Sequence, residues 1–332
     1  MPIDWQPLLK IIDSHERFVI TSHVRPDADA IGSEIGLATF LEQRGKQVRI
    51  INPSHTPDHL SFLDPNKVIR KIGTDVTADA ACDTDVHIVV DTSAWQQLQD
   101  MSPVLQKTAA KKVVIDHHLS SDDLGAIEFK DITAAAAGVL VTELIEASGD
   151  RMSPHQATAL FTAIATDTGW YRFPNTDSRT LRTAANLVDQ QAEPHLIYRL
   201  LYERSSLARL KLHSIILNRV ELACQGRLAH TFVTRKDFAA TGAHPTDTED
   251  LVNTCLSING VQAAFILVEQ QDGKTKGSLR SRSDLSVAAI AEQFGGGGHR
   301  QAAGVMLPGP LPAAQKTLLD AFEKTFLPSP AP

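Results

Sequence analysis

The chain has 332 residues, enough for two domains with separate cores. Its formal net charge of −7 argues against coating long nucleic acid, although a short phosphorylated ligand could bind beside metal ions. Three scattered cysteines argue against a disulfide framework and favour a reducing compartment: Cys82, Cys224 and Cys255. The N-terminus is not a signal peptide, and no stretch approaches the roughly 18 apolar residues of a membrane span. We therefore expect a cytoplasmic protein with no membrane partner.

Short apolar runs alternate with helical patterns in the first half of the chain. Strands are expected at residues 18–20, 47–51, 86–90 and 113–115. Helices are expected at about 31–44, ended by Gly45, and at 133–147 and 154–166. Strands that alternate with helices predict an α/β fold with a mostly parallel sheet flanked by helices.

The second half predicts a smaller α/β domain. Residues 181–201 should be partly helical, with a break near Pro194, and should connect the domains. Further helices are expected at 207–222 and 286–294, and strands at 227–234, 261–268 and 276–282. We expect a first domain at residues 1–185, a helical linker at 186–206, a second domain at 207–326 and a frayed tail at 327–332. The ligand-binding cleft is expected between the two domains.

The first strand leads into a polar turn that contains His23, Asp27 and Asp29. If the turn is near-extended, the two carboxylates point to different sides and could serve two metals. An acidic turn that caps the next helix is the alternative.

Three more segments place acids or imidazoles where elements end. Asp91 follows the strand at 86–90, and Asp116-His117-His118 follows the strand at 113–115. Asp167 ends a helix, where the helix dipole disfavours a carboxylate by about 0.3–1 kcal/mol unless a cation lies nearby. Each segment alone is compatible with a structural turn or cap. In an open α/β sheet, however, strand ends of this kind line one crevice.

Together, these segments supply the donors of a metal centre. Oxygen-rich sites with some imidazole suit Mn²⁺ or Mg²⁺, with Fe²⁺ or Co²⁺ as alternatives. Two such ions about 3.5–4 Å apart activate water and clamp the oxygens of an in-line phosphoryl displacement.

A second constellation lies near the C-terminus, in the run from Gly295 to Gly304 that includes His299. Glycine runs are costly to order, and they suit places where backbone N–H groups approach an anion closely. A flexible linker fits poorly because the run lies inside a domain. Arg280 and Arg282, on the preceding strand, could supply guanidinium groups for phosphate or could lie on a solvated strand face.

HVRPDADA, the Asp91 segment, Asp116-His117-His118 and ATDTGWYRF, in this order, resemble the four motifs of the DHH phosphoesterase superfamily. The resemblance implies that one metal is held by His23, Asp27 and Asp91. It implies that a second metal is held by Asp29, Asp91, His117 and Asp167, with Asp91 bridging. His118 would contact the substrate phosphate or assist the leaving group, and Asp116 would orient a histidine.

GGGGHRQAAG, preceded by SLRSRS, resembles the nucleic-acid-binding DHHA1 domain. The combined resemblance is closest to compact bifunctional oligoribonucleases that also dephosphorylate 3′-phosphoadenosine 5′-phosphate. It implies substrate-binding roles for Arg280, Arg282, Gly296, Gly297, Gly298 and His299. The aromatic residues Trp170, Tyr171 and Phe173 are expected mainly in the core, with a stacking surface as the alternative.

We therefore expect a Mn²⁺-dependent hydrolase of short RNA or DNA oligonucleotides, linear dinucleotides and nucleoside bisphosphates, with Mg²⁺ or Co²⁺ as alternative metals. A family II pyrophosphatase should carry a lysine-rich substrate motif instead of GGGGH. A RecJ-type exonuclease should have a further domain, and cyclic-dinucleotide phosphodiesterases often carry membrane and sensory segments. A non-catalytic nucleotide sensor should have lost metal ligands. The oligomeric state stays open between a monomer and a homodimer.

Overall fold

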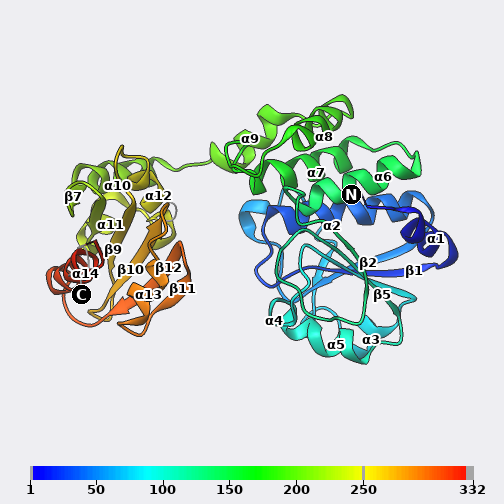
Figure 1. The fold of residues 1–332 in the computed structure, drawn as a ribbon, viewed down its shortest axis with the longest axis horizontal. Helices are drawn as coiled ribbons and strands as arrows, with labels where there is room; N and C mark the ends of the chain where they lie inside the picture. Colours follow the sequence, from blue (N-terminus) through cyan, green and yellow to red (C-terminus); the bar gives the residue numbers. More distant parts are fainter. Residues whose placement is uncertain (1–2, 249–250, 327–332) are drawn as a thin grey trace, which may run out of the picture. The chain divides into compact units, whose positions relative to one another are not determined.

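Figure 1 shows the computed structural model, which describes residues 3–248 and 251–326. The chain divides into two compact units, residues 1–204 and 205–332. No helix in these described ranges is long and apolar enough to cross a membrane.

The first unit is built on a six-stranded sheet in the order β3-β2-β1-β4-β5-β6, and every pairing is parallel. Its strands are β1 (Arg17–Thr21), β2 (Gln47–Asn52), β3 (Ile69–Lys71), β4 (Val86–Val90), β5 (Lys111–Asp116) and β6 (Ile127–Lys130). The chain fills one half of the sheet from β1 outward to β3 and then returns to β4 beside β1. Ligands of open α/β sheets bind at such a switch point, beyond the carboxyl ends of the strands.

Helices cover both faces of this sheet (Figure 1). One layer contains α1 (Gln6–Ser14), α2 (Ala28–Gln43), α6 (Ala137–Ser148) and α7 (Pro154–Asp167). The other contains α3 (Ala78–Cys82), α4 (Trp95–Leu98) and α5 (Ser102–Lys107). Against α7 pack α8 (Ser178–Asp189) and α9 (Pro194–Tyr202). Short 3₁₀ turns lie at Asp58–Leu60 and Gln99–Met101.

The central strands are largely apolar, although β4 includes the buried His87, because both faces of the sheet are covered. Ile20 and Ile115 pack into the core beneath α2 and α6, whereas Val19 and Val114 pack into the core beneath α3 and α5. This alternation follows from the two-residue period of a strand. The buried sheet gives the residues at its carboxyl edge a rigid support.

Glycines bring α2 close to α7. A Cβ atom on Gly32 would lie 2.3 Å from the carbonyl oxygen of Ala159, and one on Gly36 would lie 2.6 Å from a methyl carbon of Leu160. These two helices carry Asp29 in the first turn of α2 and Asp167 at the end of α7. Their close approach therefore helps to set the position of one carboxylate relative to the other.

The second unit contains a six-stranded mixed sheet in the order β11-β12-β10-β9-β8-β7, in which only the β8–β9 pairing is parallel among the described strands. Its strands are β7 (Glu221–Ala223), β8 (Leu228–Val233), β9 (Ala263–Glu269), β10 (Thr275–Ser281), β11 (Gly297–His299) and β12 (Ala302–Leu307). Its helices are α10 (Leu207–Asn218), α11 (Arg235–Thr241), α12 (Leu251–Leu256), α13 (Val287–Glu292) and α14 (Leu311–Phe326), with a 3₁₀ turn at Pro245–Thr248.

The two faces of this sheet are covered unequally. Phe265 and Leu279 pack with α13 and α14 on one face. On the other face, Ala264 and Ile266 of β9 pack with α10 and α12. On the adjoining strands β10 and β12, the same face carries both long and small residues, all at least partly exposed: Lys276 opposite Met306, Ser278 opposite Gly304 and Arg280 opposite Ala302.

The expected strands all form, but several element boundaries were wrong, and three of these differences have a clear consequence or cause. The helix expected at 133–147 begins at Ala137, because residues 133–136 form a turn in which Thr133 bonds to Asp131. The helix expected at 207–222 ends at Asn218, since Glu221–Ala223 pairs with β8. β10 ends at Ser281, so Arg282 lies just beyond the strand on which it was expected.

The segment at 186–206 lies mostly in the first unit, where α9 buries Ile197 in the core. Pro194 is the first residue of α9, which agrees with the break expected there. The tail expected at 327–332 lies outside the described residues.

Candidate functional site

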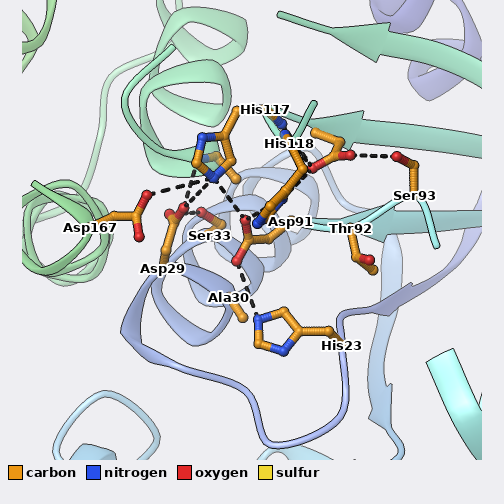
Figure 2. Close-up of polar contacts among 12 residues, drawn as sticks. His23, Asp29, Ala30, Ser33, Asp91, Thr92, Ser93, His117, His118 and Asp167 are labelled. Carbon is orange, nitrogen blue, oxygen red and sulfur yellow. Dashed lines mark hydrogen bonds and ion pairs between the residues drawn. The ribbon is translucent and has the colours of Figure 1, made fainter. Parts of the chain in front are cut away.

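Three strand ends converge at the switch point of the first sheet. His23 follows β1, Asp91 directly follows β4, and Asp116 is the last residue of β5. Figure 2 shows side chains from these strand ends meeting Asp29 of α2 and Asp167 of α7. All six residues expected from the sequence to bind metal, and both residues expected to be catalytic, lie in this cluster.

A first group of possible metal donors consists of His23, Asp27 and Asp91. His23 Nε2 lies 3.4 Å from Asp91 Oδ2 and 3.9 Å from Asp27 Oδ1. The other ring nitrogen, Nδ1, is 3.0 Å from the carbonyl oxygen of Val24, so Nε2 is the nitrogen that faces the acids. Asp27 also caps α2 by accepting hydrogen bonds from two backbone N–H groups, so the capping alternative and the cluster coexist.

A second group consists of Asp29, His117 and Asp167. His117 Nε2 lies 3.6 Å from Asp29 Oδ2, 3.6 Å from Asp167 Oδ2 and 3.3 Å from Asp91 Oδ1 (Figure 2). Its Nδ1 lies 3.2 Å from the carbonyl oxygen of Ala134, which orients the ring. Asp27 and Asp29 therefore fall into different groups, and Asp91 reaches both.

Asp29 has a second task at the start of α6. It is 1% exposed, and its two carboxylate oxygens accept hydrogen bonds from the backbone N–H groups of Ala137 (2.7 Å) and Gly138 (2.9 Å). The Ser33 hydroxyl donates a further hydrogen bond at 3.1 Å. Because the N-cap residue of α6 provides no side-chain hydrogen bond, Asp29 performs this function from α2.

Asp91 is 2% exposed and adopts a positive φ of 61°. Backbone strain of this kind in a residue other than glycine costs about 1–3 kcal/mol and is concentrated at functional sites. Its Oδ1 atom accepts no hydrogen bond of normal geometry from any residue in the described ranges. A buried, unsatisfied carboxylate oxygen between two groups of acids and imidazoles fits cation binding.

The electrostatics of the cluster also fit a cation. Burial raises the pKa of Asp29 well above its ordinary range, and the charges of Asp91 and Asp167 add to this effect. Burial likewise raises the pKa of Asp167 to about 6. Burial alone would lower the pKa of His117, but the nearby Asp91 carboxylate and the other surrounding acids raise it to about 10. Carboxylates crowded at this density are stabilised by divalent metal ions, and the donor set suits them.

His118 is placed by Asp116. Asp116 Oδ1 accepts hydrogen bonds from the backbone N–H groups of His117 and His118 and lies 2.9 Å from His118 Nδ1. Asp116 is fully buried, whereas the His118 side chain is 49% exposed. With Nδ1 engaged, His118 directs Nε2 away from the carboxylate that holds it.

Two residues behind Asp116 were missed from the sequence. The Ser93 hydroxyl donates to Asp116 Oδ2 at 2.6 Å, and Lys130 Nζ lies 2.9 Å from the Ser93 oxygen and 3.3 Å from Asp116 Oδ2. Although burial opposes ionisation of Asp116, hydrogen bonds from His118 and Ser93 hold its pKa far below the ordinary range. Ser93 could have been predicted from the sequence because it lies two residues after Asp91. Lys130 could not, because its position next to Asp116 depends on how β6 pairs with β5.

A buried polar network also supports the loop that carries His23. The Asn52 side chain accepts a hydrogen bond from the backbone N–H of Ser22 and donates one to Glu34 of α2, both at 2.9 Å. Burial raises the pKa of Glu34 to about 8. This network joins the ends of β1 and β2 to α2 directly behind the cluster.

The aromatic residues after Asp167 divide between core and surface. Trp170 and Tyr171 pack against the core of the first unit as partly buried side chains. Phe173 is 49% exposed, and its ring closely covers Gly169. The core expectation therefore holds for two of the three.

In the second unit, Arg280 and His299 share one face of the sheet. Arg280 pairs with Ala302, and Ala302 pairs in turn with His299, so the three side chains point to the same side. Two strand spacings put about 9–10 Å between the outer pair, across a small side chain. Arg282 lies outside this row and donates to the carbonyl oxygen of Ile258.

The glycine run is ordered by sheet packing. A Cβ atom on Gly296 would lie 2.4 Å from the carbonyl oxygen of Gly304, and one on Gly298 would lie 2.4 Å from that of Ala302. Gly298 also has a φ of 146°. A Cβ atom on Gly297, by contrast, would have no neighbouring atom within 4 Å. Close backbone approach thus accounts for two of the three glycines expected to bind substrate.

Comparison with known proteins agrees with this architecture. Residues 17–166 match the DHH family, N-terminal domain, and residues 226–326 match the DHHA1 domain. The bifunctional oligoribonuclease and PAP phosphatase NrnA of Thermus thermophilus is 31% identical over 315 residues, which cover 92% of this chain and 89% of that protein. The protein of the same name from Bacillus subtilis is 27% identical over 303 residues, covering 90% and 92%.

Among solved structures, an exopolyphosphatase-related protein from Bacteroides fragilis superposes with a TM-score of 0.87 and 28% identity. The match covers 97% of this chain and 96% of that one. The two matching domains, the parallel sheet and the full-length relatives define the class of the molecule. The chain belongs to the DHH superfamily of phosphoesterases.

Proposed function

We propose that this protein is a two-metal phosphoesterase that hydrolyses short oligonucleotides to mononucleotides and removes the 3′-phosphate of 3′-phosphoadenosine 5′-phosphate. The main support is Asp91, whose carboxylate faces both donor groups while one oxygen is unsatisfied by the described residues. The names of the Thermus and Bacillus relatives support this choice of substrates.

In this proposal, His23, Asp27 and Asp91 hold one ion, and Asp29, Asp91, His117 and Asp167 hold the other. Mn²⁺ is the preferred metal, because the set combines carboxylates with imidazoles. When bound, the ions supply an activated water and neutralise charge on the phosphoryl oxygens.

The proposed role of His118 follows from its hydrogen bond to Asp116. That bond fixes the proton on Nδ1, raises the pKa of the imidazole and leaves Nε2 to contact a phosphate oxygen or to donate a proton to the leaving oxygen. Ser93 and Lys130 hold the Asp116 carboxylate from behind. Asp116 therefore acts as the residue that positions His118.

We further propose that the first unit, residues 1–204, is the catalytic domain and that the second unit binds substrate. Arg280 and His299 are suited to hold a phosphate or a terminal base, because they stand on one sheet face across Ala302. The net charge of −7 also favours a short substrate over a long polymer.

The test is a side-by-side hydrolysis assay with Mn²⁺. Dinucleotides, five-mers, long single strands, 3′-phosphoadenosine 5′-phosphate and pyrophosphate are compared at equal concentration, with and without a chelator. We expect chelator-sensitive cleavage of the short oligonucleotides and of the bisphosphate. A clear preference for pyrophosphate or for long strands would overturn the proposal.

A further inference from the structure

A cavity of about 680 Å³ lies beside the acid and imidazole cluster, within the first unit. His23, Asp91 and His118 line one part of it. The rest is lined chiefly by Arg25, Thr92, Gln96, Gln97, Ser120 and Asp122. Its volume falls within the range of about 300–1,000 Å³ that is usual for small-molecule sites. The metal-binding role proposed for the cluster does not use these other residues.

Arg25 is the only lysine or arginine among the described residues that line this cavity. Its exposed side chain forms no ion pair or hydrogen bond with any residue in the described part of the chain. Its backbone is nevertheless fixed, with a positive φ of 53° and an N–H group that donates to the Ser54 hydroxyl at 3.1 Å. A held backbone with an uncommitted guanidinium is suited to contacting a ligand.

Two amides flank the same space. Gln96 and Gln97 are exposed, and their side chains form no hydrogen bond with a residue that the structure describes. The carbonyl oxygen of Gln97 accepts a hydrogen bond from the backbone N–H of Val24 at 2.8 Å, which ties this loop to the one that carries Arg25. Glutamine amides both donate and accept, and they can therefore pair with the edge of a nucleobase.

The charge balance favours a neutral group over a second phosphate. Beyond the cluster, the cavity wall contains one cation, Arg25, and one acid, Asp122. Asp122 is itself engaged, because it accepts a hydrogen bond from the backbone N–H of Trp95 at 2.8 Å. An arginine guanidinium stacks on nucleobases, so the wall fits a base attached to its ribose.

We propose that this cavity is a nucleoside subsite, in which Arg25 stacks on the base and Gln97 contacts its edge. The inference rests on the proposed function, since the nucleoside is the part of the substrate joined to the phosphate under attack. A dinucleotide has a nucleoside on each side of that phosphate, whereas 3′-phosphoadenosine 5′-phosphate has one only. The subsite therefore acts in substrate selection, separately from the metal centre.

The test compares Arg25→Ala and Gln97→Ala with the wild type and with Arg151→Ala, which removes an exposed arginine outside the cavity. Three substrates are used: a linear dinucleotide, 3′-phosphoadenosine 5′-phosphate and bis(p-nitrophenyl) phosphate, which has no nucleoside. We expect each cavity variant to raise KM for the dinucleotide and to lower its kcat/KM, relative to that of the nucleoside-free ester, by about tenfold. Arg151→Ala should leave this ratio unchanged.

The bisphosphate distinguishes the two nucleosides. If its kcat/KM falls as well, the cavity holds the nucleoside that leaves through its 3′-oxygen; if it does not, the cavity holds the nucleoside beyond the phosphate. Equal losses on all three substrates, or a dinucleotide KM within twofold of the wild-type value in both variants, would overturn the subsite. Failure of the wild-type protein to cleave any of the nucleotides would instead refute the proposed function.

Discussion

Asp91→Asn is the sharpest perturbation of the cluster, because it removes one buried charge and keeps the side-chain shape. The carboxylate lies 3.4 Å from His23, 3.3 Å from His117 and 3.7 Å from His118. Burial alone would raise the pKa of Asp91, but the nearby imidazoles of His117 and His23 lower it below its ordinary value. The charge that the substitution removes is therefore present at neutral pH.

Removing one partner of a buried charged pair costs about 3–5 kcal/mol. If the metal centre and the transition state lose binding free energy of the same size, then at about 1.36 kcal/mol per tenfold change in rate, metal-dependent kcat/KM falls by about 10²- to 10⁴-fold. Hydrolysis of 3′-phosphoadenosine 5′-phosphate and of a dinucleotide at saturating Mn²⁺ measures the rate. Isothermal titration with Mn²⁺ measures affinity and stoichiometry.

Asp100→Asn serves as the matched control, because Asp100 is an exposed aspartate outside the cluster. Circular dichroism and thermal unfolding establish that both variants fold. If folded Asp91→Asn kept kcat/KM within tenfold of the wild-type value and bound the same number of ions, the assignment of Asp91 as the shared ligand would be wrong.

Three further predictions concern packing and protonation. Gly32→Ala should lower the free energy of unfolding, measured in urea titrations, by about 1–3 kcal/mol, because the new Cβ would lie 2.3 Å from the Ala159 carbonyl oxygen. Unchanged stability would contradict the close packing of α2 on α7. The pKa of His117 is about 10 without metal, so Mn²⁺ binding should release protons, and the Mn²⁺ affinity should rise from pH 6 to pH 8. Calorimetry in buffers of different ionisation enthalpy measures this proton release. Binding heats that are identical in all buffers would count against the prediction. Burial raises the pKa of Asp237, but its bonds to Arg219, at 2.6 and 2.9 Å, lower it to about 2. The stabilisation from this ion pair is present above the unfolded pKa of about 3.9 and is lost as pH falls through about 2. Asp237→Asn should therefore lower Tm more at pH 5 than at pH 2. Equal losses of Tm at the two pH values would refute this prediction.

The candidate cluster could be predicted from the sequence because its residues follow recognisable elements. Asp91 directly follows VHIVV, and Asp116 ends the strand that contains Val113–Ile115. Parallel strands that are buried on both faces appear in a sequence as short apolar runs, and functional residues are expected directly after them, at their carboxyl ends. His23 was found by the same reasoning at the end of β1.

Long-range contacts could not be predicted in this way. Lys130 reaches Asp116 only because β6 pairs in register with β5, and the pattern IEFK gives no clear strand signal. The role of Asp29 as the cap of α6 joins residues 108 positions apart. Both contacts depend on the order of elements in the folded sheet, which local periodicity does not encode.

Asp29 also links the stability and abundance of the protein to its metal supply. Its buried carboxylate, in the first turn of α2, accepts hydrogen bonds from the first N–H groups of α6 and lies 3.6 Å from His117 Nε2. A ligand that binds only the folded state stabilises that state in proportion to the logarithm of its concentration. If the cluster binds metal as proposed, scarcity of the ion would leave crowded charges at a helix junction and expose the chain to proteolysis. A metal-starved cell would then contain fewer copies of the protein, and the remaining copies would also be less active.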